Sequence, residues 1–154
     1  MNKKEVFIRK TKPFWSNRIT YTLTNKNGDT LSELCVEKEC LSDVCYYIPE
    51  YESKKILYIT NFITTKKFRN KGYGKFLLTR VINRFKGKYD MLHLNACPYH
   101  IMYQGVYENP IFEAPENGLK MDKLIQFYKQ AGLKEIREKN TSDCKIMIML
   151  MKLR

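Results

Sequence analysis

The chain has 154 residues, which is the usual length of one domain. Hydrophobic residues make up 44% of it and only five residues are proline, so the sequence can bury a core and is not disordered throughout. Its apolar runs are too short for a membrane span or a signal-peptide core. Five cysteines, with no CxxC pair, favour a reducing compartment. We therefore expect a single domain over residues 1–154, located in the cytoplasm and with no membrane partner.

Charge is distributed unevenly along the chain. The 28 basic and 16 acidic residues leave a net charge of +12. Residues 64–88 carry nine bases and no acid, whereas residues 29–52 carry seven acids and one base. A basic segment of this kind favours a phosphate-bearing ligand, because solvated surfaces normally mix the two signs. The alternative is a solubility surface in a lysine-rich protein.

The first third of the chain is predicted to be β-structure. Residues 19–24 and 30–36 alternate polar and apolar side chains, and residues 25–29 between them are turn formers, which predicts a hairpin. The acidic residues 37–51 fit either a helix or a loop. Residues 55–63 are almost continuously apolar, which is typical of a central strand covered on both faces.

The remainder alternates helix and strand. An amphipathic helix follows the glycines at 72 and 74, ends at Gly87, and is followed by a strand at 89–96. Residues 97–117 form a long excursion, a second helix ends at Gly132, and a last strand covers residues 145–151. This order predicts an α/β fold with at least one parallel crossover.

The densest motif lies at residues 64–75, between a strand and a helix. Gly72 and Gly74 allow the backbone to approach a ligand closely, and the amides of the helix N-terminus favour an anion. Cations surround this turn at positions 66, 67, 69 and 71. We expect it to hold a pyrophosphate. The spacing excludes a P-loop, and Leu77 in place of a third glycine excludes a dinucleotide-binding fingerprint.

The sequence Arg69-Asn70-Lys71-Gly72-Tyr73-Gly74 resembles the acyl-CoA signature R/Q-x-x-G-x-G/A of the GNAT N-acetyltransferase superfamily. Residues 124–133, with Tyr128 and Gly132, resemble a later helix of that family, and the two matches together span about residues 55–136. The resemblance implies an α/β fold with a GNAT-type mixed, mostly antiparallel central sheet. That sheet would contain a splayed parallel strand pair and be flanked by helices. Acetyl-CoA would be the cosubstrate.

The resemblance also implies roles for individual residues. Backbone groups at the end of the strand before the turn would pair with the pantetheine amides, and the turn would hold the pyrophosphate. The cofactor-binding residues would be Phe62, Ile63, Thr64, Arg69, Asn70, Lys71, Gly72, Tyr73, Gly74 and Lys75. Tyr128 matches the tyrosine that protonates the departing CoA thiolate in many relatives. Its alternative role is a core aromatic, although Phe127 suits that role better on spacing.

The family reaction is direct attack of a neutral amine on the thioester, and here its general base is unassigned. Many relatives carry a carboxylate on the strand before the turn, where this chain has Thr60 and Asn61. His93, His100 and a water relay are alternatives, with structural roles open to both histidines. The absence of a base favours an acceptor that ionises easily, such as an α-amine. Met121 also replaces an asparagine that often contacts CoA.

Two further groups of residues have alternative interpretations. The aromatic residues of the excursion would form either a wall of the acceptor site or a small core; they are Tyr99, Tyr103, Tyr107 and Phe112. The cysteines at 35, 40 and 45, with Cys97 and His100, fit ordinary buried thiols better than a zinc site. No metal is therefore expected.

The acceptor is left open among a small molecule, a protein and a nucleic-acid-linked amine. The nine cations of residues 64–88 are more than one cofactor contacts. Those farthest from the glycines favour a phosphate-rich acceptor; they are Arg80, Arg84, Lys86 and Lys88. The acidic residues 29–52 favour a cationic amine instead. A module of this fold that binds acyl-CoA or nucleic acid without turnover is the alternative to an enzyme. The oligomeric state is also open, with a homodimer as one option.

Overall fold

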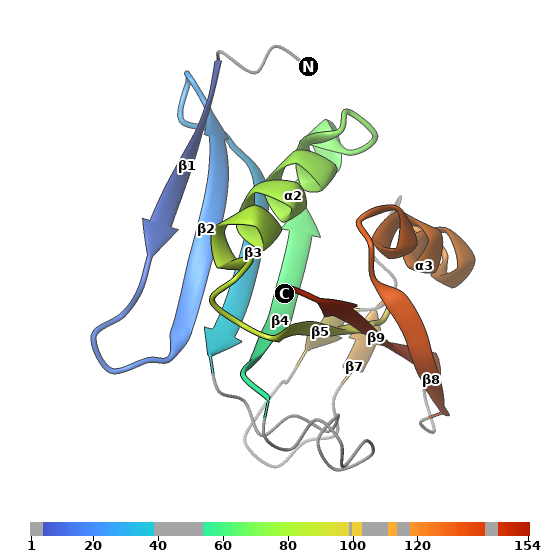
Figure 1. Cartoon of the computed structure of the whole chain (residues 1–154). Helices are drawn as coiled ribbons and strands as arrows, with labels where there is room; N and C mark the ends of the chain where they lie inside the picture. Colours follow the sequence, from blue (N-terminus) through green and yellow to red (C-terminus); the bar gives the residue numbers. More distant parts are fainter. Residues whose placement is uncertain (1–4, 39–53, 99, 103–110, 114–117, 141–144) are drawn as a thin grey trace. The chain divides into compact units, whose positions relative to one another are not determined.

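A computed structural model describes residues 5–38, 54–98, 100–102, 111–113, 118–140 and 145–154. The strands are β1 (Val6–Thr11), β2 (Arg18–Asn25), β3 (Thr30–Lys38), β4 (Ile56–Thr64), β5 (Met91–Ala96), β6 (His100–Met102), β7 (Ile111–Glu113), β8 (Lys134–Asn140) and β9 (Lys145–Lys152). The helices are the 3-10 turn η3 (Lys66–Phe68), α2 (Tyr73–Phe85) and α3 (Met121–Gln130) (Figure 1). Among these residues no helix is both long and apolar enough to cross a bilayer.

The chain divides into two compact units, each described by itself. Unit 1 comprises Met1–Leu94 and Leu150–Arg154, and unit 2 comprises Asn95–Met149. Strands β5 and β9 run from one unit into the other. The seven-stranded sheet has the order β1-β2-β3-β4-β5-β9-β8, and β6 pairs with β7 in a separate hairpin.

The predicted mixed sheet and parallel crossover are confirmed. Strands β1 to β4 follow one another as an antiparallel meander, and β4 then pairs in parallel with β5 through the crossover helix α2. A crossover element is required there, because parallel neighbours cannot be joined by a tight turn.

The predicted hairpin is β2–β3, and turn chemistry explains where it reverses. The Asn25 side-chain oxygen accepts the amides of Asn27 at 3.0 Å and Asp29 at 2.9 Å. Gly28 adopts a left-handed backbone with φ of 82°, which glycine reaches without steric cost. The acidic segment after β3 lies mostly outside the described residues.

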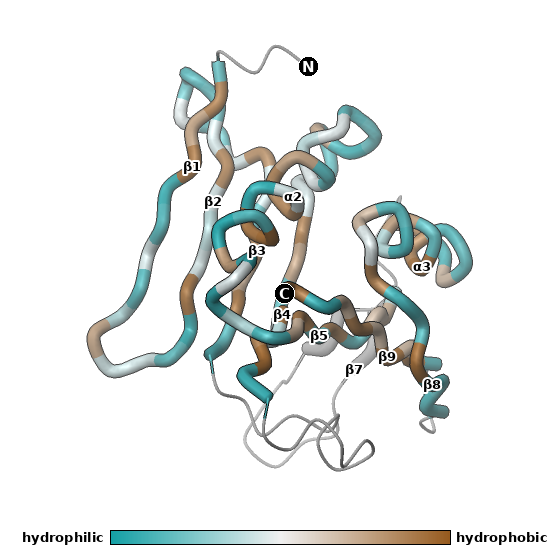
Figure 2. The backbone as a smooth tube through the Cα atoms, viewed as in Figure 1, coloured by the Kyte–Doolittle hydropathy of each residue, from teal (hydrophilic) through white to brown (hydrophobic). Residues whose placement is uncertain are grey.

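The core of unit 1 forms where α2 packs on β2, β3 and β4. The helix buries one face, made of Leu77, Leu78, Val81, Ile82 and Phe85, against buried strand residues such as Leu23, Leu34 and Leu57. Figure 2 shows hydrophobic and hydrophilic residues alternating around α2. Only the first half of β4 is covered as the sequence predicts, because Asn61 is exposed and residues 62–64 are half-buried.

Unit 2 contains α3, the β6–β7 hairpin and β8, and α3 contacts β8. The predicted end of α3 is confirmed: the Gly132 amide donates to the Lys129 carbonyl at 2.9 Å, and Gly132 has φ of 98°. The predicted excursion contains β6 and β7 within its described residues. Strands β1 and β8 were not predicted; both are almost entirely exposed, so no buried face imposes strand alternation on their residues.

Candidate functional site

Strand β4 leaves its parallel partner halfway along its length. Pairing with β5 runs from Ile56 opposite Met91 to Ile59 opposite Leu94, and β4 then continues for five more residues. The pairing of β4 with β3 shifts at the same point: Val36 lies opposite Ile59 and Cys35 opposite Asn61. Thr60 is therefore the extra residue of a β-bulge, which bends a strand and ends regular pairing.

The bend leaves residues 61–64 with β3 as their only partner among the described strands. Backbone amides and carbonyls on the opposite edge of such a strand can pair with an extended ligand that carries its own amides. Phe62, Ile63 and Thr64, the residues predicted to bind pantetheine, occupy this edge.

Ser32 fixes the end of β4, and sequence reasoning did not single it out. This buried serine donates its hydroxyl to the Ile63 carbonyl at 2.8 Å and lies 3.1 Å from the Thr64 hydroxyl. The Thr65 amide also donates to Leu31 of β3 at 3.0 Å. The sequence did contain a signal for this role. Strand alternation places Ser32 on the same inward face as Leu34 and Val36, and a polar residue on a buried face indicates a hydrogen bond there.

The turn after β4 is closed by its own residues. Arg69 donates Nε to the Thr64 carbonyl at 3.0 Å, so its guanidinium shapes the turn as well as adding charge. Asn70 and Gly72 both have positive φ, at 59° and 82°. Asparagine and glycine are the residues that tolerate this conformation, so the local sequence suits the turn.

The two glycines serve different purposes. A Cβ at Gly72 would meet no atom within 4 Å, so Gly72 is required for its backbone angle. A Cβ at Gly74 would lie 2.8 Å from the Thr64 hydroxyl and 3.4 Å from Cζ of Phe62. Gly74 therefore allows the helix to start directly against the end of β4.

The start of α2 presents backbone donors. The first helical bond runs from the Phe76 amide to the Gly72 carbonyl at 3.0 Å, so the amides of Tyr73, Gly74 and Lys75 have no acceptor within the helix. Gly72 has no side chain to cap them. Amides of this kind, together with the positive end of the helix dipole, form an anion site.

The charges around the turn reinforce that site. The first turn of α2 contains no acidic residue, and Lys71 and Lys75 are exposed. Lys67 pairs with Asp29 at 3.3 Å, and both side chains are exposed enough for solvent to weaken the pair. The pKa of the Asp29 carboxyl lies below its usual value. The hydrogen bond from Asn25 is the largest cause, and the hydrogen bond and positive charge of Lys67 come next. The residues present therefore fit a diphosphate.

Tyr128 lies on α3 in unit 2 and is buried, with the Phe127 ring 5.3 Å away between centroids. Burial raises the pKa of its hydroxyl well above the usual value of 10. The hydroxyl therefore holds its proton at neutral and moderately alkaline pH, as a proton donor must. The turn residues lie together in unit 1, and Tyr128 is described within unit 2 alone.

The candidate bases differ in their surroundings. His93 is only 1% exposed, and its ring stacks on Tyr58, its cross-strand neighbour, at 4.7 Å and an angle of 24°. This environment supports a structural role for His93. Thr60 buries its hydroxyl without a hydrogen-bond partner among the described residues, and Asn61 is exposed. Neither side chain has the chemistry of a base.

Several predicted residues fall outside the described part. Tyr99, Tyr103, Tyr107, Cys40 and Cys45 lie there, as do the side chains of His100 and Phe112. Cys35 is buried with its sulfur 3.3 Å from the Thr20 hydroxyl, as an ordinary thiol would be. Among the described residues, no three His, Cys, Asp or Glu side chains come together as metal ligands.

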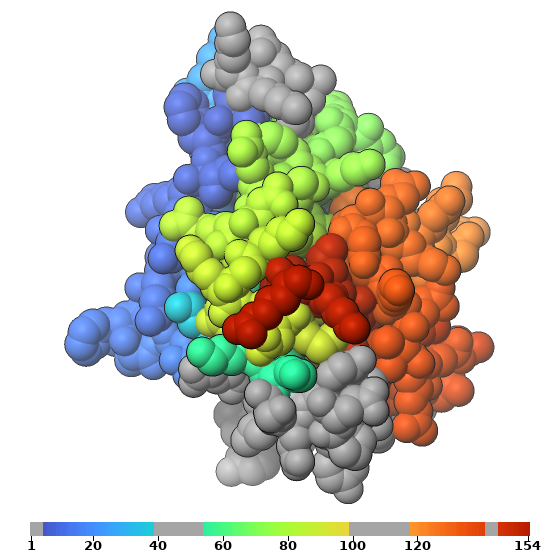
Figure 3. All heavy atoms as spheres, in the orientation of Figure 1, coloured from blue at the N-terminus to red at the C-terminus, as the bar shows by residue number. Residues whose placement is uncertain are grey.

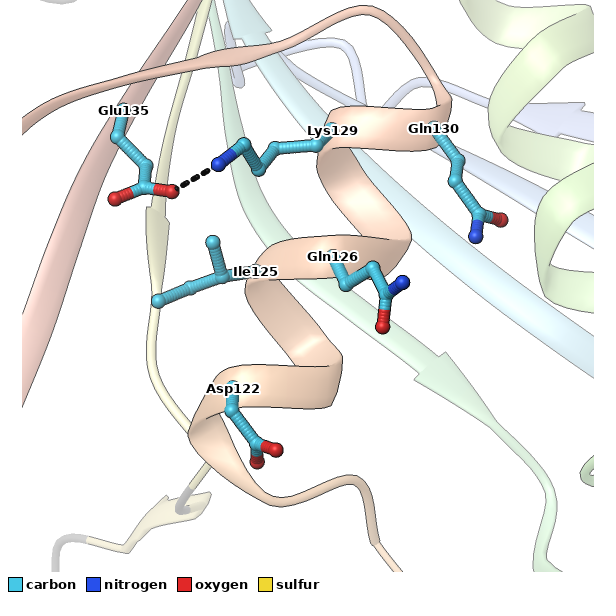
Figure 4. A pocket seen from close by; sticks show the side chains of 6 residues that line it. All are labelled: Asp122, Ile125, Gln126, Lys129, Gln130 and Glu135. Atoms are coloured by element: carbon cyan, nitrogen blue, oxygen red, sulfur yellow. Dashed lines mark hydrogen bonds and ion pairs between the residues drawn. The ribbon is translucent and has the colours of Figure 1, made fainter.

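An open hollow of about 620 Å³ lies along α3 in unit 2 (Figure 4). Its lining residues are Asp122, Ile125, Gln126, Lys129, Gln130 and Glu135. Lys129 and Glu135 pair across it at 2.6 Å, so part of its charge is already neutralised. None of these residues belongs to the predicted acyl-CoA site.

Comparison with family models assigns the fold. The model of the acetyltransferase (GNAT) family matches residues 7–105, and the chain belongs to this family. The expected family and fold are therefore confirmed, and membership supports acetyl-CoA as the cosubstrate. The comparison with curated proteins found no match.

Solved structures show the same fold at low sequence identity. Arabidopsis thaliana NAA60 in complex with acetyl-CoA is 10% identical, with a TM-score of 0.64 over 96% of this chain and 98% of that one. The ribosomal-protein-S18-alanine N-acetyltransferase of Escherichia coli is 14% identical, with a TM-score of 0.55 over 89% and 70%. Spermidine/spermine N-acetyltransferase SpeG of Vibrio cholerae is 8% identical, with a TM-score of 0.61 over 97% and 94%. Their acceptors include different classes of amine, so the shared fold does not identify the acceptor of this chain.

Proposed function

We propose that this protein transfers an acetyl group from acetyl-CoA to an amine. The observation that carries the proposal is the β4–α2 turn. There Gly74 allows helix amides that have no acceptor within the helix to start against the end of a strand that has left its parallel partner. Family membership supplies the reaction class.

The two parts of acetyl-CoA require different recognition. Its diphosphate would accept hydrogen bonds from the amides of residues 73–75, with Lys71 and Lys75 supplying charge. Its pantetheine amides would pair with the edge of β4 at Phe62, Ile63 and Thr64. Ser32 supports this arrangement because it holds the Ile63 carbonyl and the Thr64 hydroxyl on the β3 side.

In the reaction, the neutral acceptor nitrogen forms a bond to the thioester carbonyl carbon, and the carbon–sulfur bond then breaks. A backbone amide near Ile63 or Thr64 would stabilise the negative oxygen that develops on that carbon. The Tyr128 hydroxyl would protonate the departing thiolate, and the amine would lose its extra proton to solvent. The raised pKa of Tyr128 supports the donor role because the hydroxyl stays protonated until it is used.

An acceptor with an α-amine fits this site better than a lysine side chain. An α-amine has a pKa of about 7.7–8.0, so a substantial fraction of it is neutral at pH 7. A lysine amine has a pKa of about 10.4 and is almost entirely charged at that pH. Thr60 and Asn61 offer no carboxylate to remove the proton. Enzymes without such a base depend more on the acceptor's own ionisation.

The test is a thiol-release assay with acetyl-CoA and a panel of amines: peptides with free N-termini, polyamines, lysine peptides and aminoacyl esters. We expect CoA release with N-terminal peptides and faster turnover as the pH rises through the acceptor's pKa. Release with none of the amines, in protein that binds acetyl-CoA, would support the second candidate. That candidate is an acyl-CoA-binding module without turnover, favoured by the missing carboxylate at Thr60 and Asn61.

A further inference from the structure

The outer side of α2 and strand β1 form one basic surface in unit 1. Lys10 of β1 lies opposite Tyr21 of β2, so both side chains project from the same face of the sheet. This is the face that α2 covers, because the Arg84 guanidinium lies 6.0 Å from the centroid of the Tyr21 ring. Lys10 and Arg84 therefore face the same side of the sheet from neighbouring elements.

The two arginines of α2 contact aromatic rings, and these contacts leave their positive charges unneutralised. Arg80 lies over the Phe76 ring at 5.3 Å, as Arg84 does over Tyr21. Both arginines and Lys10 are exposed, and none forms an ion pair with another residue of the described part. Since the helix itself has no acidic residue, its outer side is free to attract anions.

The same surface ends at two unusually exposed aromatic residues. Phe14 is 100% exposed and Trp15 is 89% exposed, in the short connection between β1 and β2. Figure 3 shows this end of the hairpin in blue, projecting at the lower left. Large aromatic side chains so fully exposed contribute nothing to the core, and a binding role explains them.

This surface is separate from the proposed acyl-CoA site. The turn after β4 contacts the β2–β3 end of the sheet, where Lys67 pairs with Asp29. Phe14 and Trp15 precede the opposite end of β2, which is eight residues long, or about 23 Å at about 3.3 Å per residue. The aromatic pair is thus too far from the turn to share its ligand.

We propose that this surface, consisting of Lys10, Phe14, Trp15, Arg80 and Arg84, binds single-stranded nucleic acid. Fixed cations follow a phosphate backbone, and exposed rings provide stacking platforms for unpaired bases. A second copy of the chain is disfavoured, because it would bring like charges together. Lys12 and Arg18 flank the aromatic pair, as a bilayer anchor would require, but the cations continue from there along β1 and onto a helix, a track that a single nucleic-acid strand can follow.

Trp15 provides a direct readout because it is the only tryptophan of the chain. We expect its fluorescence to be quenched on titration with 12-nucleotide oligo(U) or oligo(dT), since stacked bases quench indole. The affinity should fall as the salt concentration rises. If three cations each contact one phosphate, the logarithm of the association constant should fall with the logarithm of the salt concentration at a slope of about −2, since each contact with a single strand contributes about −0.7.

The variants separate the two parts of the surface. Arg80→Gln with Arg84→Gln should reduce the salt slope to about a third, and Phe14→Ala should weaken binding about tenfold with the slope unchanged. Lys123→Gln with Lys134→Gln removes two exposed charges from unit 2 and should have no effect. Circular dichroism checks that each variant is folded.

Quenching that is independent of salt, or equal loss of binding in the Lys123 and Lys134 control, would overturn the proposal. A blue shift of Trp15 with anionic vesicles, and no response to either oligonucleotide, would assign the surface to a membrane instead and would also overturn it. The titrations need neither acetyl-CoA nor an acceptor, so they do not depend on the proposed acetyl transfer.

Discussion

The β4–α2 turn in unit 1 and helix α3 in unit 2 differ in what would carry out their proposed roles. At the turn, backbone groups would bind the cofactor, and the missing side chains at Gly72 and Gly74 make this possible. On α3 a single side chain, Tyr128, would donate the proton, and burial keeps its hydroxyl protonated by raising its pKa. Cofactor binding therefore depends on local geometry, whereas proton donation depends on the packing around one hydroxyl.

Because of this difference, we expect the β4–α2 turn and Tyr128 to control different kinetic constants. Variants of the turn should change the affinity for acetyl-CoA, because the proposed contacts of the turn are to parts of acetyl-CoA that do not react. Variants of Tyr128 should change the chemical step instead, because its proton is needed only as the thiolate departs.

The largest effect is expected for Tyr128→Phe. Losing a general acid lowers kcat by about 10²–10⁴-fold, and KM for acetyl-CoA should stay nearly constant. Phe127→Leu is the matched control on the same helix and should retain most activity. In the wild type, the raised pKa of Tyr128 predicts no alkaline fall in kcat up to about pH 10, the usual tyrosine value. An unchanged kcat in Tyr128→Phe would remove the proposed donor.

Gly74→Ala should have the next largest effect, on KM. The new methyl group would lie 2.8 Å from the Thr64 hydroxyl, and overpacking of this kind costs about 1–3 kcal/mol, or about 5- to 150-fold in affinity. Gly72→Asn is the matched control, because asparagine tolerates the positive φ and position 72 has space for a side chain. Equal losses of acetyl-CoA binding in both variants, measured by calorimetry, would contradict the separate roles of the two glycines.

Ser32→Ala tests the support beneath the β4 edge. The change removes the donor to the Ile63 carbonyl, and because this carbonyl is only half-buried we expect a loss of about 1 kcal/mol of stability. We expect a lower melting temperature and a several-fold higher KM for acetyl-CoA. Thr20→Ala, which removes a half-buried hydroxyl elsewhere in the sheet, should leave KM unchanged. A stable Ser32→Ala protein with normal KM would show that the β4 edge needs no such support.

The smallest effect is expected for Asp29→Asn. The pKa of Asp29 is lower in the folded protein, so its charged form adds stability above its unfolded pKa of about 3.9, and this is lost as the pH falls through the folded value. The wild type should therefore melt slightly above the variant at pH 7, and the difference should disappear in acid. High salt should reduce the difference too, since the pair with Lys67 is exposed. Melting curves at pH 7 and pH 3 measure it.

Local sequence patterns predicted much of the fold and the turn. Asn25 and Gly28 determine the hairpin reversal through nearby atoms, and Gly72 and Gly74 mark the turn for the same reason. Exposed strands such as β1 and β8 escape prediction because no buried face imposes alternation on their residues. The bulge at Thr60 depends on pairing with Cys35 and Val36, which are distant in sequence.

The bulge has a consequence for variation at position 60. Between Leu57 and Thr64, Thr60 is the one residue of β4 with no counterpart on β3, so its side chain matters less than its presence as the extra residue of the bulge. Deleting it would leave Ile59 opposite Val36 and Asn61 opposite Cys35 as consecutive regular pairs, so the bulge and the bend that it gives β4 would be lost. We therefore expect position 60 to accept many substitutions but not a deletion, because without the bend β4 would stay alongside β5 beyond Ile59 and residues 61–64 would lose their free edge.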